Sequence, residues 1–235
     1  MNTESLQESP LHHEVHGELV RRFLNPLPEF HLLSRRDEGR ESAEAFVQDR
    51  YRAQHGAAVT HFLPWLFTMQ CLGSPSGVAG LQPAGPAPLF LEQYLDGSVE
   101  EVLAAKGACA VERRAIVEVG NLVAARRGAS HLLFLLFTAT LATAGYRWIV
   151  FTATQALRNN LENLGLPLME LQRVTASTLP PEIQAVWGSY YATDPRVMAA
   201  SLDEVTTLIG SKALYRHIGR LYRGHIRSLA ERLGR

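Results

Sequence analysis

The hydrophobic positions along the chain predict alternating strands and helices. The clearest stretch reads as a strand over 114–123, a basic turn over 126–130, an apolar helix over 131–145, a strand over 147–153 and a helix over 155–164, closed by Gly165-Leu166-Pro167. Two neighbouring parallel strands joined by a right-handed crossover helix are expected for this order. The pattern therefore predicts an α/β fold with this unit at its centre.

Shorter patterns on either side extend the prediction. Further strands are expected over 30–34, 65–72, 77–81, 168–174 and 197–202, with further helices over 41–55, 99–105 and 212–233. Gly73–Gly77 is rich in turn-forming residues and predicts a hairpin between the second and third strands. Residues 178–195 are expected to form an irregular insert.

The length of 235 residues suits one large domain with flanking segments. We expect an N-terminal arm over 1–28, a main domain over 29–210 and a basic amphipathic C-terminal helix over 211–235. His12-His13 and His16 in the arm lack matching ligands at a useful spacing, so we interpret them as solvated and predict no metal site.

Charge and cysteine content narrow the functional classes. Lys plus Arg and Asp plus Glu both number 23, so the net charge gives no support for nucleic-acid binding. Cys71 and Cys109 form neither a disulfide framework nor a zinc pattern, which fits a reducing cytoplasm, and the first 30 residues lack the order of a signal peptide. The longest apolar run, Leu132–Ala144, is shorter than the ~20 residues of a membrane span and predicts a buried helix.

The basic turn before the central helix is a candidate anion site. A helix start offers unpaired backbone N–H groups and the positive end of the helix dipole, and neighbouring arginines strengthen the attraction. A pyrophosphate or a phosphopantetheine group is the expected ligand. The candidate residues are Val123, Arg126, Arg127, Gly128, Ala129, Ser130 and Thr154.

Three segments carry a resemblance to a known family. Leu89–Asp96, Val117–Ala124 and Trp187–Tyr191, the last followed by Pro195–Met198, resemble the signatures of the thermostable hemolysin family over residues 40–205. The order of elements is similar to the GNAT acyltransferase superfamily and its autoinducer-synthase branch. The resemblance implies a GNAT-like mixed β-sheet flanked by helices. It also implies transfer of a fatty acyl group from acyl-CoA or an acyl carrier protein to an amine-bearing small molecule, with no permanently bound cofactor.

The chain departs from autoinducer synthases at several motif positions. Gly120 and Asn121 stand where their Glu-x-Ser-Arg motif has serine and arginine, and Gly80 stands where they carry an arginine before Leu-Leu-Pro. No equivalent of their earlier catalytic aspartate lies between Ala57 and Leu66. These departures argue against S-adenosylmethionine binding and homoserine-lactone synthesis.

Aminolysis of a thioester needs a base, and Glu118 is the candidate, because burial on a central strand raises the pKa of a carboxyl group. The alternative is a structural pair with Arg50 or Arg52. Asn121 is a candidate substrate or carrier contact if a bulge turns it inward, and otherwise a buried hydrogen-bonding residue. Tyr190 is a candidate acid for the leaving thiolate, or part of the pocket wall.

Glu92, Tyr94 and Arg50 are the candidate acceptor contacts, with helix capping and packing as the alternatives for Glu92 and Tyr94. The alternative function is of another class: a membrane-active, haemolysin-like protein that disturbs bilayers through its basic C-terminal helix. The last 25 residues hold seven basic side chains and one acidic one, which also suits peripheral contact with the inner face of a membrane.

Overall fold

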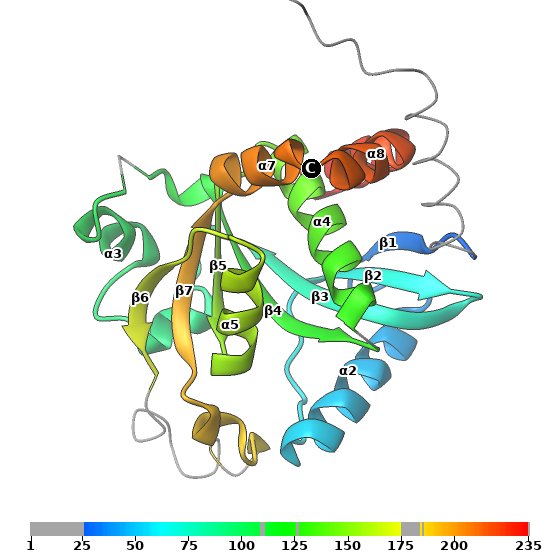
Figure 1. Ribbon diagram of the computed structural model, residues 1–235. Helices are drawn as coiled ribbons and strands as arrows, with labels where there is room; N and C mark the ends of the chain where they lie inside the picture. The colour runs from blue at the N-terminus through cyan, green and yellow to red at the C-terminus, as the bar shows by residue number, and fades with distance from the viewer. Residues whose placement is uncertain (1–25, 109–110, 126, 175–183, 185, 235) are drawn as a thin grey trace, which may run out of the picture.

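The computed structural model describes residues 26–108, 111–125, 127–174, 184 and 186–234 (Figure 1). Its centre is a seven-stranded mixed sheet in the order β1-β2-β3-β4-β5-β7-β6. The strands are β1 (Glu29–Leu33), β2 (Trp65–Cys71), β3 (Ser74–Pro83), β4 (Ile116–Ala124), β5 (Trp148–Ala153), β6 (Met169–Arg173) and β7 (Arg196–Ser201). Among the described strands, only β4 and β5 pair in parallel, as the sequence pattern predicted.

Helices cover both faces of the sheet. The α-helices are α2 (Arg40–His55), α3 (Val99–Ala105), α4 (Arg127–Thr143), α5 (Gln155–Asn163), α7 (Leu202–Ser211), α8 (Ala213–Leu221) and α9 (Arg223–Leu233), and short 3₁₀ turns are η1 (Phe90–Tyr94), η2 (Arg113–Ala115) and η4 (Tyr190–Thr193). The largest apolar cluster joins the sheet to α4, α5, α7, α8 and α9. In Figure 1, α4 crosses the sheet with α7 and α8 beside it.

The opposite face of the sheet carries two separate apolar clusters. One joins α3 and η1 to the central strands through residues such as Leu91 and Ile116. The other joins α2 to β2 and β3 through residues such as Val47 and Leu66. Side chains alternate along a strand, so Val117 and Val119 face the large cluster while Glu118 faces this opposite side.

The hairpin between β2 and β3 turns more tightly than expected. Leu72 and Gly73 form the turn, with φ of 52° and 75°, and β3 already begins at Ser74. A two-residue turn with both φ values positive matches the twist of paired strands. The expected turn over Gly73–Gly77 is therefore wrong, since most of that segment pairs with β2.

A bulge interrupts β4 between Gly120 and Val123, after Glu118. The register with β3 passes from Gly80–Gly120 to Val78–Val123, so β4 contains one extra residue there. Asn121 sits in this bulge with φ of 48°. On the other side, pairing with β5 ends at Val119–Phe151, although both strands continue beyond it. The bulge on which the predicted role of Asn121 depended is therefore present.

Helix α4 begins at Arg127, four residues earlier than the sequence pattern placed it. Gly128, Ala129 and Ser130 therefore belong to the first helical turn rather than to a preceding loop. A glycine and two small residues can enter a helix as readily as a turn, which explains the misplaced boundary. The unpaired backbone N–H groups at the start of α4 consequently lie nearer to the end of β4 than expected.

The C-terminal segment is not one helix. α8 ends before Tyr222 and α9 starts after it, while α7 fills a region that the sequence analysis left without a helix. Ile218, Ile226, Leu229 and Leu233 pack into the large cluster, whereas Leu214 and Leu221 are 48% and 42% exposed. Most of the apolar stripe of this segment, formed by Leu214, Ile218, Leu221, Tyr222, Ile226, Leu229 and Leu233, is thus used within the fold.

Two polar contacts fix this segment. The Tyr222 hydroxyl donates to the carbonyl of Pro28, and Arg232 pairs with Asp37 at 2.7 Å. Docking on the domain, rather than a free amphipathic helix, is the arrangement found. In the described part of the chain, no helix is both long enough and apolar enough to cross a membrane.

Candidate active site

Glu118 lies on the face of β4 between the two apolar clusters, and only 4% of its surface is exposed. Its two carboxylate oxygens accept hydrogen bonds from backbone N–H groups: Oε2 from Phe90 at 2.8 Å and Oε1 from Leu91 at 3.1 Å. Neither Arg50 nor Arg52 pairs with it, because both bind elsewhere. The carboxylate is thus held in position by η1, and no cationic side chain among the described residues pairs with it.

Burial raises the pKa of Glu118 to about 7, because desolvation disfavours the charged form. The two backbone hydrogen bonds act in the opposite direction, and the negative charge of Glu92 adds to the increase. A carboxyl group with this pKa exchanges protons readily near neutral pH. The electrostatic setting expected for a general base is therefore present.

A pocket opens in front of this carboxylate. Its lining is mostly aromatic and comes from α2, the segment after it, η1, β4, β5 and the segment that ends in η4. The lining residues are Tyr51, His61, Leu63, Phe90, Tyr94, Glu118, Val119, Gly120, Asn121, Thr152, Trp187, Tyr190 and Tyr191. The three sequence segments that carried the family resemblance therefore meet at one place.

Two phenols link the first and the last of these segments. The hydroxyl oxygens of Tyr94 and Tyr191 lie 2.8 Å apart, across 97 residues of sequence. Burial raises the pKa of both hydroxyl groups above the usual value, so both phenols are neutral at physiological pH. The pair places a neutral polar group on an otherwise apolar wall.

The aromatic wall around Trp187 is docked on the end of α2. Gly188 has φ of 53°, and a Cβ atom at this position would lie 2.1 Å from the carbonyl oxygen of His55. The same carbonyl accepts a hydrogen bond from the backbone N–H of Ser189 at 2.9 Å. Only glycine permits this close approach, which brings the Trp187 ring within 6.0 Å of the Tyr51 ring.

Tyr190 belongs to the wall of the pocket. Its hydroxyl group donates to the carbonyl oxygen of Thr152 at 3.4 Å, and its ring packs against Trp187 and His55. Burial holds the pKa of the phenol well above its usual value. This geometry favours the wall role over proton donation to a leaving thiolate.

Asn121 uses both ends of its side-chain amide within the protein. Oδ1 accepts from the backbone N–H of Leu63 at 3.0 Å, and Nδ2 donates to the carbonyl oxygen of His61 at 3.1 Å. The residue therefore fixes the loop before β2 against the bulge of β4. Of its two expected roles, the geometry favours the structural hydrogen bonds.

Glu92 is similarly occupied. Both of its oxygens bind Arg113, at 2.7 and 2.9 Å, and they also accept from the backbone N–H groups of Leu89 and Val99. The bonds from Arg113 lower the pKa of Glu92 to about 2. Capping and packing, rather than acceptor recognition, are the roles that this geometry supports.

Two candidate residues lie where β4 ends: Arg50, expected to contact the acceptor, and Val123, expected to contact the acyl donor. Arg50 donates to the carbonyl oxygens of Ala124 and Ala125, at 3.2 and 2.7 Å, and so holds the end of β4 against α2. Val123 packs on the α2 cluster. Arg126 lies outside the described residues, as do the side chains of Arg127 and Gly128, so their part in anion binding stays a prediction.

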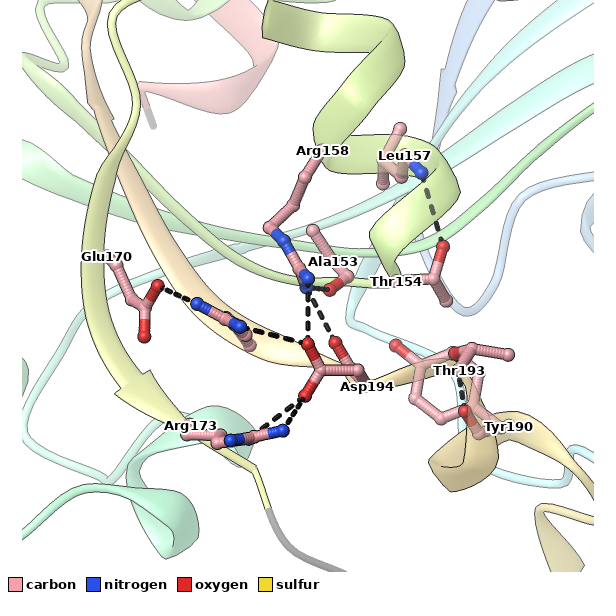
Figure 2. Close-up of polar contacts among 10 residues, drawn as sticks. Ala153, Thr154, Leu157, Arg158, Glu170, Arg173, Tyr190, Thr193 and Asp194 are labelled. Atoms are coloured by element: carbon pink, nitrogen blue, oxygen red, sulfur yellow. Dashed lines mark hydrogen bonds and ion pairs between the residues drawn. The ribbon is translucent and has the colours of Figure 1, made fainter.

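Thr154 caps α5 at the end of β5, where its hydroxyl accepts from the backbone N–H of Leu157 at 3.3 Å. Figure 2 shows it beside a network centred on Asp194, whose φ is 51°. The Asp194 carboxylate binds Arg158, Arg173 and Arg196. Buried Arg158 also donates to the carbonyl oxygen of Asp194, so this network ties η4 and its tyrosines to α5.

Several lining residues were not anticipated. Tyr51, His61, Leu63, Phe90, Thr152 and Trp187 carried no functional prediction, although Phe90 and Trp187 fall inside the resembling segments. His61 and Leu63 lie in an irregular loop with no local signal for a pocket. Among the residues that the structure describes, no group of His, Cys, Asp or Glu is arranged to hold a metal ion.

Solved structures share this fold. The chain is similar to the AHL synthase LasI (10% identity, TM-score 0.52, covering 74% of this chain and 90% of that one). It is also similar to BjaI, a CoA-dependent acyl-homoserine lactone synthase solved with SAM and isopentyl-CoA (12%, 0.51, 82% and 90%). A third match is FeeM, an N-acyl amino acid synthase from uncultured soil microbes (14%, 0.51, 81% and 98%). At these identities the likeness establishes the fold, and the expected mixed sheet of the autoinducer-synthase kind is confirmed.

Sequence comparison establishes the family. No curated protein sequence matches this chain significantly. The family profile for thermostable hemolysin matches residues 33–206, which include β2 to β7 and the pocket residues. The chain therefore belongs to the thermostable hemolysin family.

Proposed function

We propose that the protein is an N-acyltransferase that moves a fatty acyl group from an acyl-CoA or acyl-carrier-protein thioester to an amine, with Glu118 as the general base. The observation that carries this proposal is the buried carboxylate itself. It faces an aromatic pocket, it has no cationic partner in the described part of the chain, and its pKa is about 7. The fold that the chain shares with acyl-homoserine lactone synthases supports the reaction class.

The gap between β4 and β5 supports a binding site for the acyl donor. The strands stop pairing at Val119–Phe151, directly beside Glu118. A pantetheine arm lying in this gap would bring its thioester to the pocket. The start of α4 lies at the far end of β4, where its backbone N–H groups suit the carrier phosphates. We assign Arg126–Ser130 to that site, with Thr154 across the gap.

The reaction proceeds by direct attack in a ternary complex. Ionised Glu118 accepts a proton from the ammonium form of the acceptor, and the nitrogen lone pair then forms the C–N bond at the thioester carbonyl. Collapse of the tetrahedral intermediate breaks the C–S bond. The amide nitrogen loses its extra proton and the leaving thiolate gains one, so the products are an amide and a free thiol. The mechanism requires no acyl-enzyme.

The test is Glu118→Gln, which keeps the shape of the side chain and removes its proton affinity. Thiol release with an acyl-CoA series and an amine panel should fall by about 10²–10⁴-fold. Glu112→Gln is the matched control, because Glu112 is exposed and pairs with Arg114 outside the pocket. Glu118→Gln that folds normally and turns over at the parent rate would contradict the base assignment.

A further inference from the structure

The charge distribution in the pocket constrains the acceptor. Glu118 is the only charged carboxylate in the described lining, and no lysine or arginine is among those lining residues. His61 is exposed, and its ring stacks on Phe90 with the centroids 5.3 Å apart. The described lining therefore offers a carboxyl group and aromatic surfaces, and no fixed positive charge.

Four arginines on elements around the pocket are already bound within the protein. Arg40 donates to three backbone carbonyls, those of Leu33, Leu63 and Pro64, and pairs with Glu44. Arg50 holds the end of β4, Arg113 holds Glu92, and Arg158 holds Asp194. Releasing any of them toward a ligand would break several of these contacts at once.

These observations bear on acceptors that carry a carboxylate. An acceptor with a carboxylate beside its amine would place a negative charge near Glu118 in a poorly solvated space. An ion transferred from water into such a site without a partner is strongly disfavoured. We propose that the acceptor is a primary amine with an apolar or aromatic body and no carboxylate. This inference rests on the proposed function and specifies its second substrate.

The same walls suit the amine itself. A cationic ammonium group is attracted both by the Glu118 carboxylate and by the faces of aromatic rings such as Trp187 and Phe90. The body of the acceptor then packs on the remaining rings of the lining. The hydroxyl groups of Tyr94 and Tyr191 offer a neutral hydrogen-bonding site, which accommodates a phenol or an alcohol without requiring a charge.

Matched acceptor pairs test the proposal. Phenethylamine and phenylalanine differ only by the carboxylate, as do tyramine and tyrosine. With one acyl-CoA donor at a fixed concentration, kcat/KM for each amine should exceed that of its amino acid by about 100-fold or more. Equal or better turnover of the amino acids by the parent protein would overturn the inference while leaving acyl transfer intact.

A designed cation provides the second test. His61→Arg places a guanidinium group at the exposed rim of the pocket and should raise kcat/KM for phenylalanine by about tenfold. His61→Gln is the uncharged control and should leave the preference for phenethylamine unchanged. If the arginine variant folds and shows the parent preference, the missing cation does not set the selectivity and the inference fails.

Binding separates this inference from the proposed reaction. Isothermal titration of the intact protein with phenethylamine and with phenylalanine, in the absence of donor, needs no turnover. Preferential binding of phenethylamine without thiol release from any acyl-CoA would sustain the ligand class and reject the acyltransferase. Thiol release with other amines but no preferential binding of phenethylamine over phenylalanine would reject the ligand class alone.

Discussion

A Cβ atom on Gly80 would lie 2.6 Å from Oδ1 of Asn121, so these two residues fit together only as a pair. They face each other across β3 and β4, where Gly80 also pairs with Gly120. All three positions are departures from the autoinducer-synthase pattern. These three departures therefore form one local change, in which Asn121 fixes the loop that contains His61 and Leu63.

The first prediction follows from this contact. Gly80→Ala should lower the free energy of unfolding by about 1–3 kcal/mol, because the added methyl group displaces Asn121. Asn121→Gly removes the displaced side chain and keeps a residue that tolerates φ of 48°. In a double-mutant cycle by urea denaturation, the two changes together should cost about 1 kcal/mol less than their sum. If the changes in unfolding free energy simply add, the contact between the two residues does not contribute to stability.

The second prediction concerns pH and stability. Glu118 has a pKa of about 7 in the folded protein and about 4.5 when unfolded, so the folded state binds more protons between these values. The free energy of unfolding should therefore fall as pH rises from 4.5 to 7, by roughly 3 kcal/mol at most. Glu118→Gln should lack this slope in thermal or urea unfolding. A parent and a variant with parallel pH profiles would disprove the raised pKa.

The third prediction concerns the Glu92–Arg113 pair. Glu92→Gln weakens the attachment of η1, which carries the two N–H groups that bind Glu118, and should cost about 2–4 kcal/mol of unfolding free energy. Since the pKa of Glu92 is lowered to about 2, its contribution is complete above pH 4.5 and disappears as pH falls through 2. Glu112→Gln, which breaks a surface pair, should cost less than about 1 kcal/mol. Equal losses in both variants would argue against a structural role.

The fourth prediction concerns binding of the acyl donor. Arg126→Ala combined with Arg127→Ala should weaken acyl-CoA or carrier binding, and the loss should be larger at low salt because charge is least screened there. Titration calorimetry at two ionic strengths measures both effects. Donor affinity that is unchanged at every salt concentration would place the phosphate site elsewhere.

The fifth prediction concerns the C-terminal helices. Leu229 packs into the large cluster and Leu221 is exposed, so Leu229→Ala should cost about 2–4 kcal/mol and Leu221→Ala less than about 0.5 kcal/mol. Urea denaturation distinguishes the two. The intact protein should also not release dye from anionic vesicles, because most of its apolar stripe is buried. Leakage that disappears on removal of residues 212–235 would instead favour the membrane-active alternative.

The sequence identified part of the site and missed the rest for a physical reason. Glu118 could be recognised because a lone carboxylate inside a β-branched apolar run is costly and therefore informative. Phe90 and Trp187 lay in segments that resembled a family, without any sign that they met. Glu92 and Asn121 looked like substrate contacts, because a sequence shows a polar side chain and conceals the backbone groups that already satisfy it.

Local patterns determined most of the order of elements, the parallel pairing of β4 with β5 and the position of Glu118 on a central strand, because hydrophobic periodicity depends on residues that are close in sequence. Tertiary structure decided three matters. It set the start of α4, where small residues suit helix and turn alike. It broke the C-terminal helix at Tyr222, whose hydroxyl binds the carbonyl of Pro28. It also joined Tyr94 to Tyr191, since contact across 97 residues depends on how the whole sheet is assembled.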